Sequence, residues 1–175
     1  MKVHGGEALR DAVAGAFEEA ARLLGQLSDR HLFGVPPTEG ASPIAVHHRH
    51  QLEHGRQLLE GMASGLVDYD ARPHDASLSS DRRRLLAANA ELVRDLRALR
   101  RADLDKPVEV LQIFDVGAPT ARAKSTVARE LMFLFEHTVH HNALIALLLR
   151  LQSLDVPEPF GVMPSTLAAR LRAAG

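Results

Sequence analysis

Residues 130–151 constrain the fold more than any other part of the chain. They read ELMFLFEHTVHHNALIALLLRL, which is mostly apolar but contains three histidines, Glu136, Asn142 and Arg150. So many ionisable and polar side chains would make a membrane span costly. We therefore expect this stretch to form a long helix buried in a soluble protein.

Three further stretches carry apolar residues at three- and four-residue intervals, the spacing of a helix with one buried face. They cover residues 6–27, about 43–65 and about 80–100, and the fourth helix is expected to begin at Ser125 or Thr126 and to end near Leu151. Ser42 is expected to cap the second helix, with Pro43 in its first position. A last short helix is expected over residues 165–172.

The connection between the third and fourth helices has a different pattern. Residues 108–116 alternate between apolar and polar with a period near two, and residues 120–124 can form a returning strand. This pattern favours a short hairpin or an extended crossover. The fold prediction is an all-α four-helix bundle with a long, partly extended connection between helices 3 and 4, in one domain over residues 1–175.

Composition excludes several function classes. Lys and Arg number 21 and Asp and Glu 22, so we expect no electrostatic surface for nucleic acid. The sequence has no G-x-S-x-G, P-loop or dinucleotide-binding motif. It also has no cysteine, so any metal must be held by histidine and carboxylate. The N-terminus shows no apolar segment typical of a signal peptide, and we expect a cytoplasmic protein with no membrane partner.

Seven of the ten histidines fall in two clusters on predicted helices. They are His47, His48, His50 and His54 in the second helix, and His137, His140 and His141 in the fourth. Residues four apart share a helix face, as His137 and His141 do. On the second helix three histidines form one seam and His48 lies nearer the centre of the apolar face. Periodicity alone does not choose among them.

The clusters have a structural and a chemical interpretation. A histidine pair on an apolar helix is often part of a hydrogen-bonded core, because a buried imidazole without partners costs about 1–3 kcal/mol. Two histidines from one helix and one from another would instead make a three-histidine metal site with an open position, the pattern of catalytic rather than structural zinc sites. Imidazole suits Zn, Ni, Fe and Cu, so the ligand type does not identify the metal.

Two motifs carry a family resemblance. The segment IAVHHRH, residues 44–50, followed by Glu53, and the segment HTVHH, residues 137–141, resemble the motifs of the DinB-like metal-binding four-helix-bundle superfamily. The resemblance covers the whole chain in helix order. It implies that His50, His137 and His141 are the metal ligands and that His140 is not one. The additional histidines depart from the family pattern, and His47 or His54 could replace or supplement His50.

The resemblance also implies a function. Relatives include metal-dependent transferases or isomerases that use a low-molecular-weight thiol, and others that look like metal-dependent hydrolases. We expect a Zn, Ni or Fe enzyme with a small-molecule substrate, in which Glu53 or Glu130 orients a ligand or acts as general base. The alternatives are a non-catalytic stress or regulatory metal-binding bundle that forms a homodimer, and a purely structural bundle.

Overall fold

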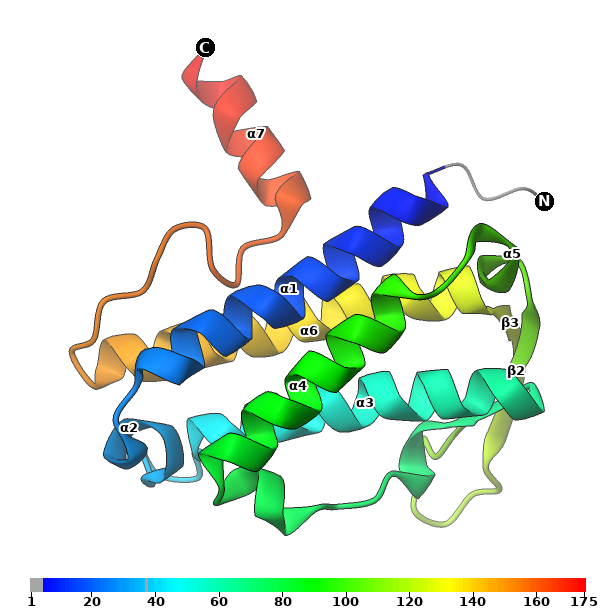
Figure 1. Cartoon of the computed structure of the whole chain (residues 1–175), viewed down its shortest axis with the longest axis horizontal. Helices are drawn as coiled ribbons and strands as arrows, with labels where there is room; N and C mark the ends of the chain where they lie inside the picture. Colours follow the sequence, from blue (N-terminus) through cyan, green and yellow to red (C-terminus); the bar gives the residue numbers. More distant parts are fainter. Residues whose placement is uncertain (1–4, 37) are drawn as a thin grey trace.

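A computed structural model describes residues 5–36 and 38–175 of the chain (Figure 1). The prediction that no leader is present rests in part on residues 1–4, which lie outside the described residues. The long helices are α1 (Gly6–Gln26), α3 (Ile44–Ser64), α4 (Arg82–Arg97) and α6 (Val127–Leu151). Shorter helices are α2 (Asp29–Phe33), α5 (Arg101–Leu104) and α7 (Pro164–Ala174), with single 3-10 turns η1 (Tyr69–Ala71) and η2 (Ala76–Ser79).

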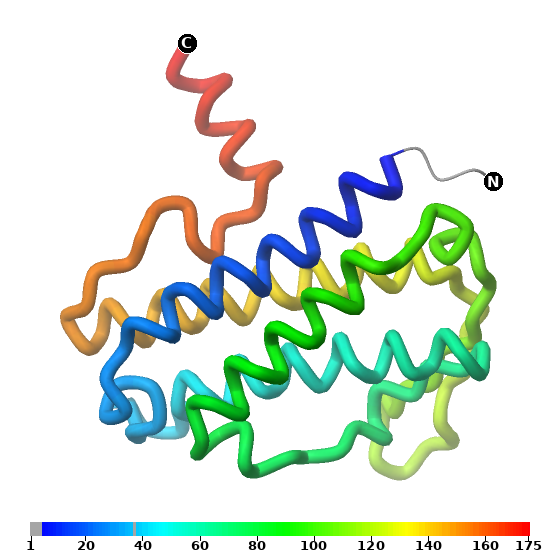
Figure 2. Tube along the Cα trace, viewed as in Figure 1, coloured from blue at the N-terminus to red at the C-terminus, as the bar shows by residue number. Residues whose placement is uncertain are grey.

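The four long helices pack along one another. Helix α1 contacts α4 and α6, and α3 contacts the same two helices (Figures 1 and 2). Their apolar stripes meet in one core, whose large side chains are fully buried: Phe17, Leu24, Leu52, Leu92 and Leu131. The three-four spacing of the sequence therefore predicted the helices and their buried faces correctly.

The helix ends follow ordinary capping chemistry. Asp81 caps α4 by accepting hydrogen bonds from the backbone N–H groups of Arg83 and Arg84, and Thr126 caps α6 in the same way. Gly65 ends α3 in the left-handed conformation, as a glycine C-terminal stop should. Helix α3 begins at Ile44, so Pro43 is the residue before the helix rather than its first residue.

The chain also contains a small sheet that corrects the all-α prediction. The strands are β1 (Leu66–Asp68), β2 (Pro107–Gln112) and β3 (Ala121–Thr126), in the order β1-β2-β3. β2 and β3 form the expected antiparallel hairpin, whereas β1 pairs with β2 in parallel. A strand of three residues has no measurable periodicity, which is why the sequence did not predict β1. The described fold is thus mainly α-helical with a three-stranded mixed sheet.

The sheet lies at the end of the helices where α3 finishes and α6 begins (Figure 1). Strand β1 follows α3 directly, and β3 runs without a gap into α6. Helix α6 starts at Val127, one or two residues after the predicted start, because Ser125 and Thr126 belong to β3. Helix α7 projects away from the other helices and buries none of its residues. Among the described residues, none of the helices combines the length and the hydropathy that crossing a bilayer requires.

Two glycines give a matched test of the packing between α3 and β1. A Cβ atom at Gly61 would lie 2.7 Å from the Leu66 carbonyl oxygen and 2.9 Å from the Val67 Cα, whereas a Cβ at Gly15 in α1 would meet nothing within 4 Å. We expect Gly61→Ala to lower the free energy of unfolding by about 1–3 kcal/mol because backbone must move. Gly15→Ala should raise it by about 0.5–1 kcal/mol, as glycine is unfavourable inside a helix. Urea denaturation measures both, and a stabilised Gly61→Ala protein would contradict the close packing.

Candidate metal centre

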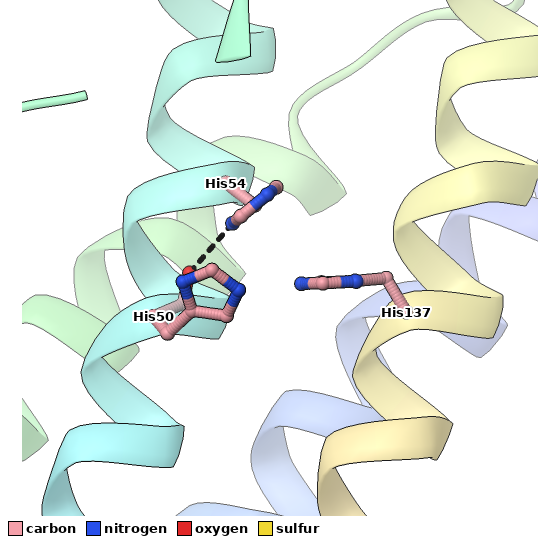
Figure 3. Close-up of side chains that lie close together, drawn as sticks. All are labelled: His50, His54 and His137. Atoms are coloured by element: carbon pink, nitrogen blue, oxygen red, sulfur yellow. Dashed lines mark hydrogen bonds between the residues drawn. The ribbon is translucent and has the colours of Figure 1, made fainter. Parts of the chain in front are cut away.

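Three histidines converge between α3 and α6. His50 and His54 lie one helical turn apart on α3, and His137 faces them from α6 (Figure 3). One ring nitrogen of each lies within 4.8 Å of the others, a spacing at which one ion could contact all three. The group could therefore hold a metal ion. It includes two of the three predicted ligands, His50 and His137.

The protonation of His54 is fixed by the backbone. Its Nδ1 lies 2.9 Å from the carbonyl oxygen of His50, the contact drawn in Figure 3. A carbonyl only accepts hydrogen bonds, so Nδ1 carries the proton and Nε2 carries the lone pair. A backbone acceptor on one nitrogen is the usual way in which proteins orient a metal-binding histidine. His54 thus has the tautomer of an Nε2 ligand.

His137 supplies the clearest sign of a missing partner. Its Nε2 atom is buried and has no hydrogen-bond partner among the described residues. A buried polar nitrogen without a partner costs about 1–3 kcal/mol, so such atoms in proteins usually contact something. The atom faces the two imidazoles of α3, and a metal ion held with them would satisfy it.

His141 lies beside the group. Its ring centre is 4.7 Å from that of His50 and 4.6 Å from that of His137. Its Nδ1 is 3.2 Å from the Nδ1 of His47, so one of these two rings donates a hydrogen bond to the other. When His141 is the donor, its Nε2 carries the lone pair that a metal ligand needs. The role of His141 as a ligand stays a prediction. His140 is exposed, consistent with the expectation that it is a neighbour only.

Burial keeps the cluster neutral at physiological pH. It is the main cause that lowers the pKa of His54 and His137 to about 4 and that of His50 and His141 to about 3. The positive charges that neighbouring histidines would carry lower the pKa further. Only a neutral imidazole can donate a lone pair to a metal. At pH 7 the donor set is therefore ready to bind a cation without losing protons.

Aromatic rings and a buried carboxylate border the histidines. The ring of Tyr69 stacks on His54 at 5.5 Å and that of Phe133 stacks on His137 at 5.6 Å. The Tyr69 hydroxyl donates to Glu130 Oε2 at 2.9 Å, and the Ser125 hydroxyl donates to Oε1 at 2.5 Å. Burial and the nearby Glu130 carboxylate raise the pKa of Tyr69. Glu130 thus reaches the cluster through Tyr69.

Glu53 contacts a different part of the protein from the group of His50, His54 and His137. Its Oε1 accepts a hydrogen bond from the backbone N–H of Asp75 at 3.1 Å and lies 3.3 Å from Arg49 Nε, while its Oε2 lies 3.7 Å from His74 Nδ1. Burial raises the pKa of Glu53, and Arg49 opposes this shift. These contacts tie α3 to the segment before η2.

His48 belongs to a polar network rather than to the cluster. Its Nδ1 lies 2.9 Å from Gln51 Oε1, and its Nε2 lies 3.0 Å from Asn89 Oδ1. A neutral imidazole donates from one nitrogen only, so with Nδ1 donating to Gln51 the Asn89 amide turns its N–H group toward Nε2. Gln51 in turn donates to Asn142 Oδ1 at 3.0 Å and to the Thr138 carbonyl at 3.2 Å. The ring is fully buried, and burial lowers its pKa to about 4. His48 therefore joins α3 to α4 as a neutral side chain.

Sequence reasoning identified the two helices but not all the contributors. His54 repeats at α3 the four-residue spacing that marks His137 and His141 on α6, and this signal could have ranked it beside His50. Tyr69 and Arg72 come from η1 and the residue after it, and nothing in their local sequence links them to the histidines. Arg72 Nη1 lies 3.4 Å from His54 Nε2 and also donates to the Tyr69 carbonyl.

Comparison of the chain with protein-family models, with curated proteins and with solved structures finds no match.

Removing the Tyr69 hydroxyl tests the connection to Glu130. We expect Tyr69→Phe to lower the free energy of unfolding by about 1–3 kcal/mol, because Glu130 Oε2 would lose its donor inside the protein. Ser80→Ala is the matched control: its hydroxyl is exposed, and the change should be below about 0.5 kcal/mol. Equal effects in the two proteins, measured by urea denaturation, would contradict the buried contact.

The lowered pKa of His48 predicts acid sensitivity in the metal-free protein. An unfolded histidine binds a proton below about pH 6.5, whereas folded His48 does so only near its pKa of about 4. The unfolded state thus holds more protons between these values, and stability falls as the pH falls. His48 alone should remove about 2 kcal/mol between pH 7 and pH 5. Denaturation of wild-type and His48→Gln proteins at both pH values measures this, and an identical pH dependence would refute it.

Proposed function

We propose that the chain binds a divalent transition metal between α3 and α6 and uses it in catalysis. The observation that carries the proposal is the buried, unpartnered Nε2 of His137 opposite two neutral imidazoles of α3. Desolvated histidines of this kind need a partner for each nitrogen. Three nitrogens from His50, His54 and His137 within 4.8 Å of one another fit a three-histidine site.

The proposal has two candidates for the third metal ligand, His54 and His141. His50 and His137 belong both to the converging group and to the set implied by the DinB-like resemblance. His54 is the third member of the converging group, with its ring centre 4.3 Å from that of His50 and 4.2 Å from that of His137. His141 is the third ligand that the resemblance implies, and its ring centre lies 4.7 Å and 4.6 Å from the same two rings. The packing of α1, α3, α4 and α6 along one another supports a DinB-like four-helix bundle.

Arg72 favours an enzyme over a structural site. Its guanidinium reaches within 3.4 Å of His54 Nε2, and its Nε is buried without a hydrogen-bond partner among the described residues. A cation in this place repels a bare metal ion, and an anion bound beside the metal would stabilise both charges. His50, His137 and either His54 or His141 would hold a Zn, Ni or Fe ion, which would lower the pKa of a bound water or thiol and so supply a nucleophile. Arg72 is then placed to bind an anionic group of the substrate or of a low-molecular-weight thiol.

These features support a metal-dependent hydrolase or thiol-dependent transferase acting on a small molecule. Neither Glu53 nor Glu130 is needed as a ligand in this proposal. Glu130 acts through Tyr69, whose ring stacks on His54 and holds that imidazole in orientation. Glu53 holds the segment that follows Arg72.

A second candidate is a non-catalytic metal-binding protein that forms a homodimer. The observation in its favour is the apolar outer surface of α6, where Met132, Leu147 and Leu151 are about half exposed. Such exposed side chains on one helix suit a helix-to-helix contact with a second copy. A dimer contact on this face is compatible with either function, so the chemistry at the metal distinguishes them.

Metal content of variants tests the proposal. After incubation with zinc and desalting, the wild-type protein should retain about one equivalent, and His137→Gln should retain less than about 0.2. His140→Gln, which changes an exposed neighbour, is the matched control and should retain as much zinc as the wild type. Elemental analysis beside circular dichroism separates loss of the metal from loss of the fold.

The same measurement identifies the third ligand. Loss of zinc in His54→Gln with retention in His141→Gln would assign His54, and the reverse would assign His141. If all four variants of the cluster, at His50, His54, His137 and His141, retained zinc like the wild type, the metal centre would be rejected.

A further inference from the structure

A second site lies on the other side of the aromatic residues that border the histidines. A cavity of about 580 Å³ lies between the β2–β3 hairpin and the first turns of α6. This volume falls within the range of about 300–1,000 Å³ that is usual for small-molecule sites. Tyr69 and Phe133 line the cavity with one part of their surface and contact His54 and His137 with another.

The cavity exists because the side chains on one face of the hairpin are small. Ala121 and Ala123 are two residues apart, so both point to the same face of β3. Their cross-strand partners on β2, Gln112 and Val110, line the cavity as well. One face of the hairpin is therefore turned toward α6 but carries alanine where a larger side chain would fill the gap.

The lining is strongly aromatic for this chain. It contains the single tyrosine and two of the six phenylalanines, Phe114 and Phe133, although the chain has no tryptophan. Phe114 is 78% exposed, which is costly for a ring of this size unless something covers it. Exposed apolar surface beside a cavity is typical of a site that takes an apolar ligand.

The charges of the cavity favour an anion. Its lining includes two cations, Lys124 and Arg129, and one acid, Glu130. Both oxygens of Glu130 already accept hydrogen bonds from hydroxyl groups, and the side chain is buried. Arg129 Nη1 lies 3.6 Å from Glu130 Oε1, but the Arg129 side chain is 64% exposed, and its guanidinium carbon lies 5.9 Å from the centre of the Phe133 ring. An aromatic surface and a solvent-exposed guanidinium thus lie side by side.

We propose that this cavity binds a small aromatic molecule that carries one anionic group, with its rings between Phe114 and Phe133 and its anion at Arg129. The proposal goes beyond the metal-dependent function and does not require it. Because Tyr69 and Phe133 separate the cavity from the histidines, binding can be measured with the metal removed.

Fluorescence titration with 1-anilinonaphthalene-8-sulfonate, an aromatic sulfonate, tests the site on the full chain in the presence of EDTA. We expect one saturable site per chain. Ala123→Trp should weaken binding at least about tenfold, because the indole occupies the cavity. Ala90→Trp, at an exposed alanine of α4, is the matched control and should bind as the wild type does. Circular dichroism and cooperative thermal unfolding establish that both variants are folded.

A neutral analogue tests the anion contact. Arg129→Gln should weaken the sulfonate about three- to tenfold and leave N-phenyl-1-naphthylamine, which has the same rings without the sulfonate, unchanged. Equal sulfonate affinity in Ala123→Trp and Ala90→Trp would overturn the cavity as the site. An Arg129→Gln protein that binds both probes like the wild type would overturn the assignment of an anionic ligand. Loss of zinc binding in the histidine variants leaves this result unaffected, so the two proposals fail separately.

Discussion

One constraint acts on the interface between α3 and α6: each polar nitrogen buried there needs a hydrogen-bond or metal partner. Near the start of α3 the protein's own side chains satisfy this constraint. They form one hydrogen-bonded network of His48, Gln51, Asn89 and Asn142. Beside this network they do not satisfy it, because the Nε2 of His137 has no hydrogen-bond partner among the described residues. The α3–α6 pair therefore contains a polar network that stabilises the fold and, next to it, a histidine cluster with an unpartnered nitrogen.

The small sheet brings further side chains to the histidine cluster. β1 leads from the end of α3 into η1 and so brings Tyr69 and Arg72 to the histidines, and β3 leads into α6 and brings Ser125 to Glu130. Tyr69 contacts both groups: its ring stacks on His54, and its hydroxyl donates a hydrogen bond to Glu130. The connection between α3 and α4 thus supplies Tyr69 and Arg72 beside the histidines, and the connection between α4 and α6 forms the hairpin that lines the cavity.

Local patterns predicted what depends on local geometry. The long helices and the hairpin before α6 follow from periodicity. Periodicity did not choose among the histidines of α3, and it was the DinB-like resemblance that implied His50 together with His137. β1 could not be predicted, because three residues carry no period, and with the hairpin it makes the fold mainly α-helical rather than all-α. Tyr69 and Arg72 could not be predicted either, since their place beside His54 depends on a chain reversal after Gly65. The hydrogen-bond partners of Glu53 and Glu130 could not be predicted either, because they come from segments outside the helices' own spacing pattern.

The zinc K-edge X-ray absorption spectrum of the reconstituted protein tests the central claim most directly, because it counts imidazole ligands at the metal. The account predicts three histidine nitrogens at about 2.0–2.1 Å and one further oxygen or nitrogen from solvent. The spectrum of His137→Gln should then lose this environment together with the zinc. A wild-type spectrum with fewer than three imidazoles, or one dominated by carboxylate oxygens, would contradict a metal centre between α3 and α6.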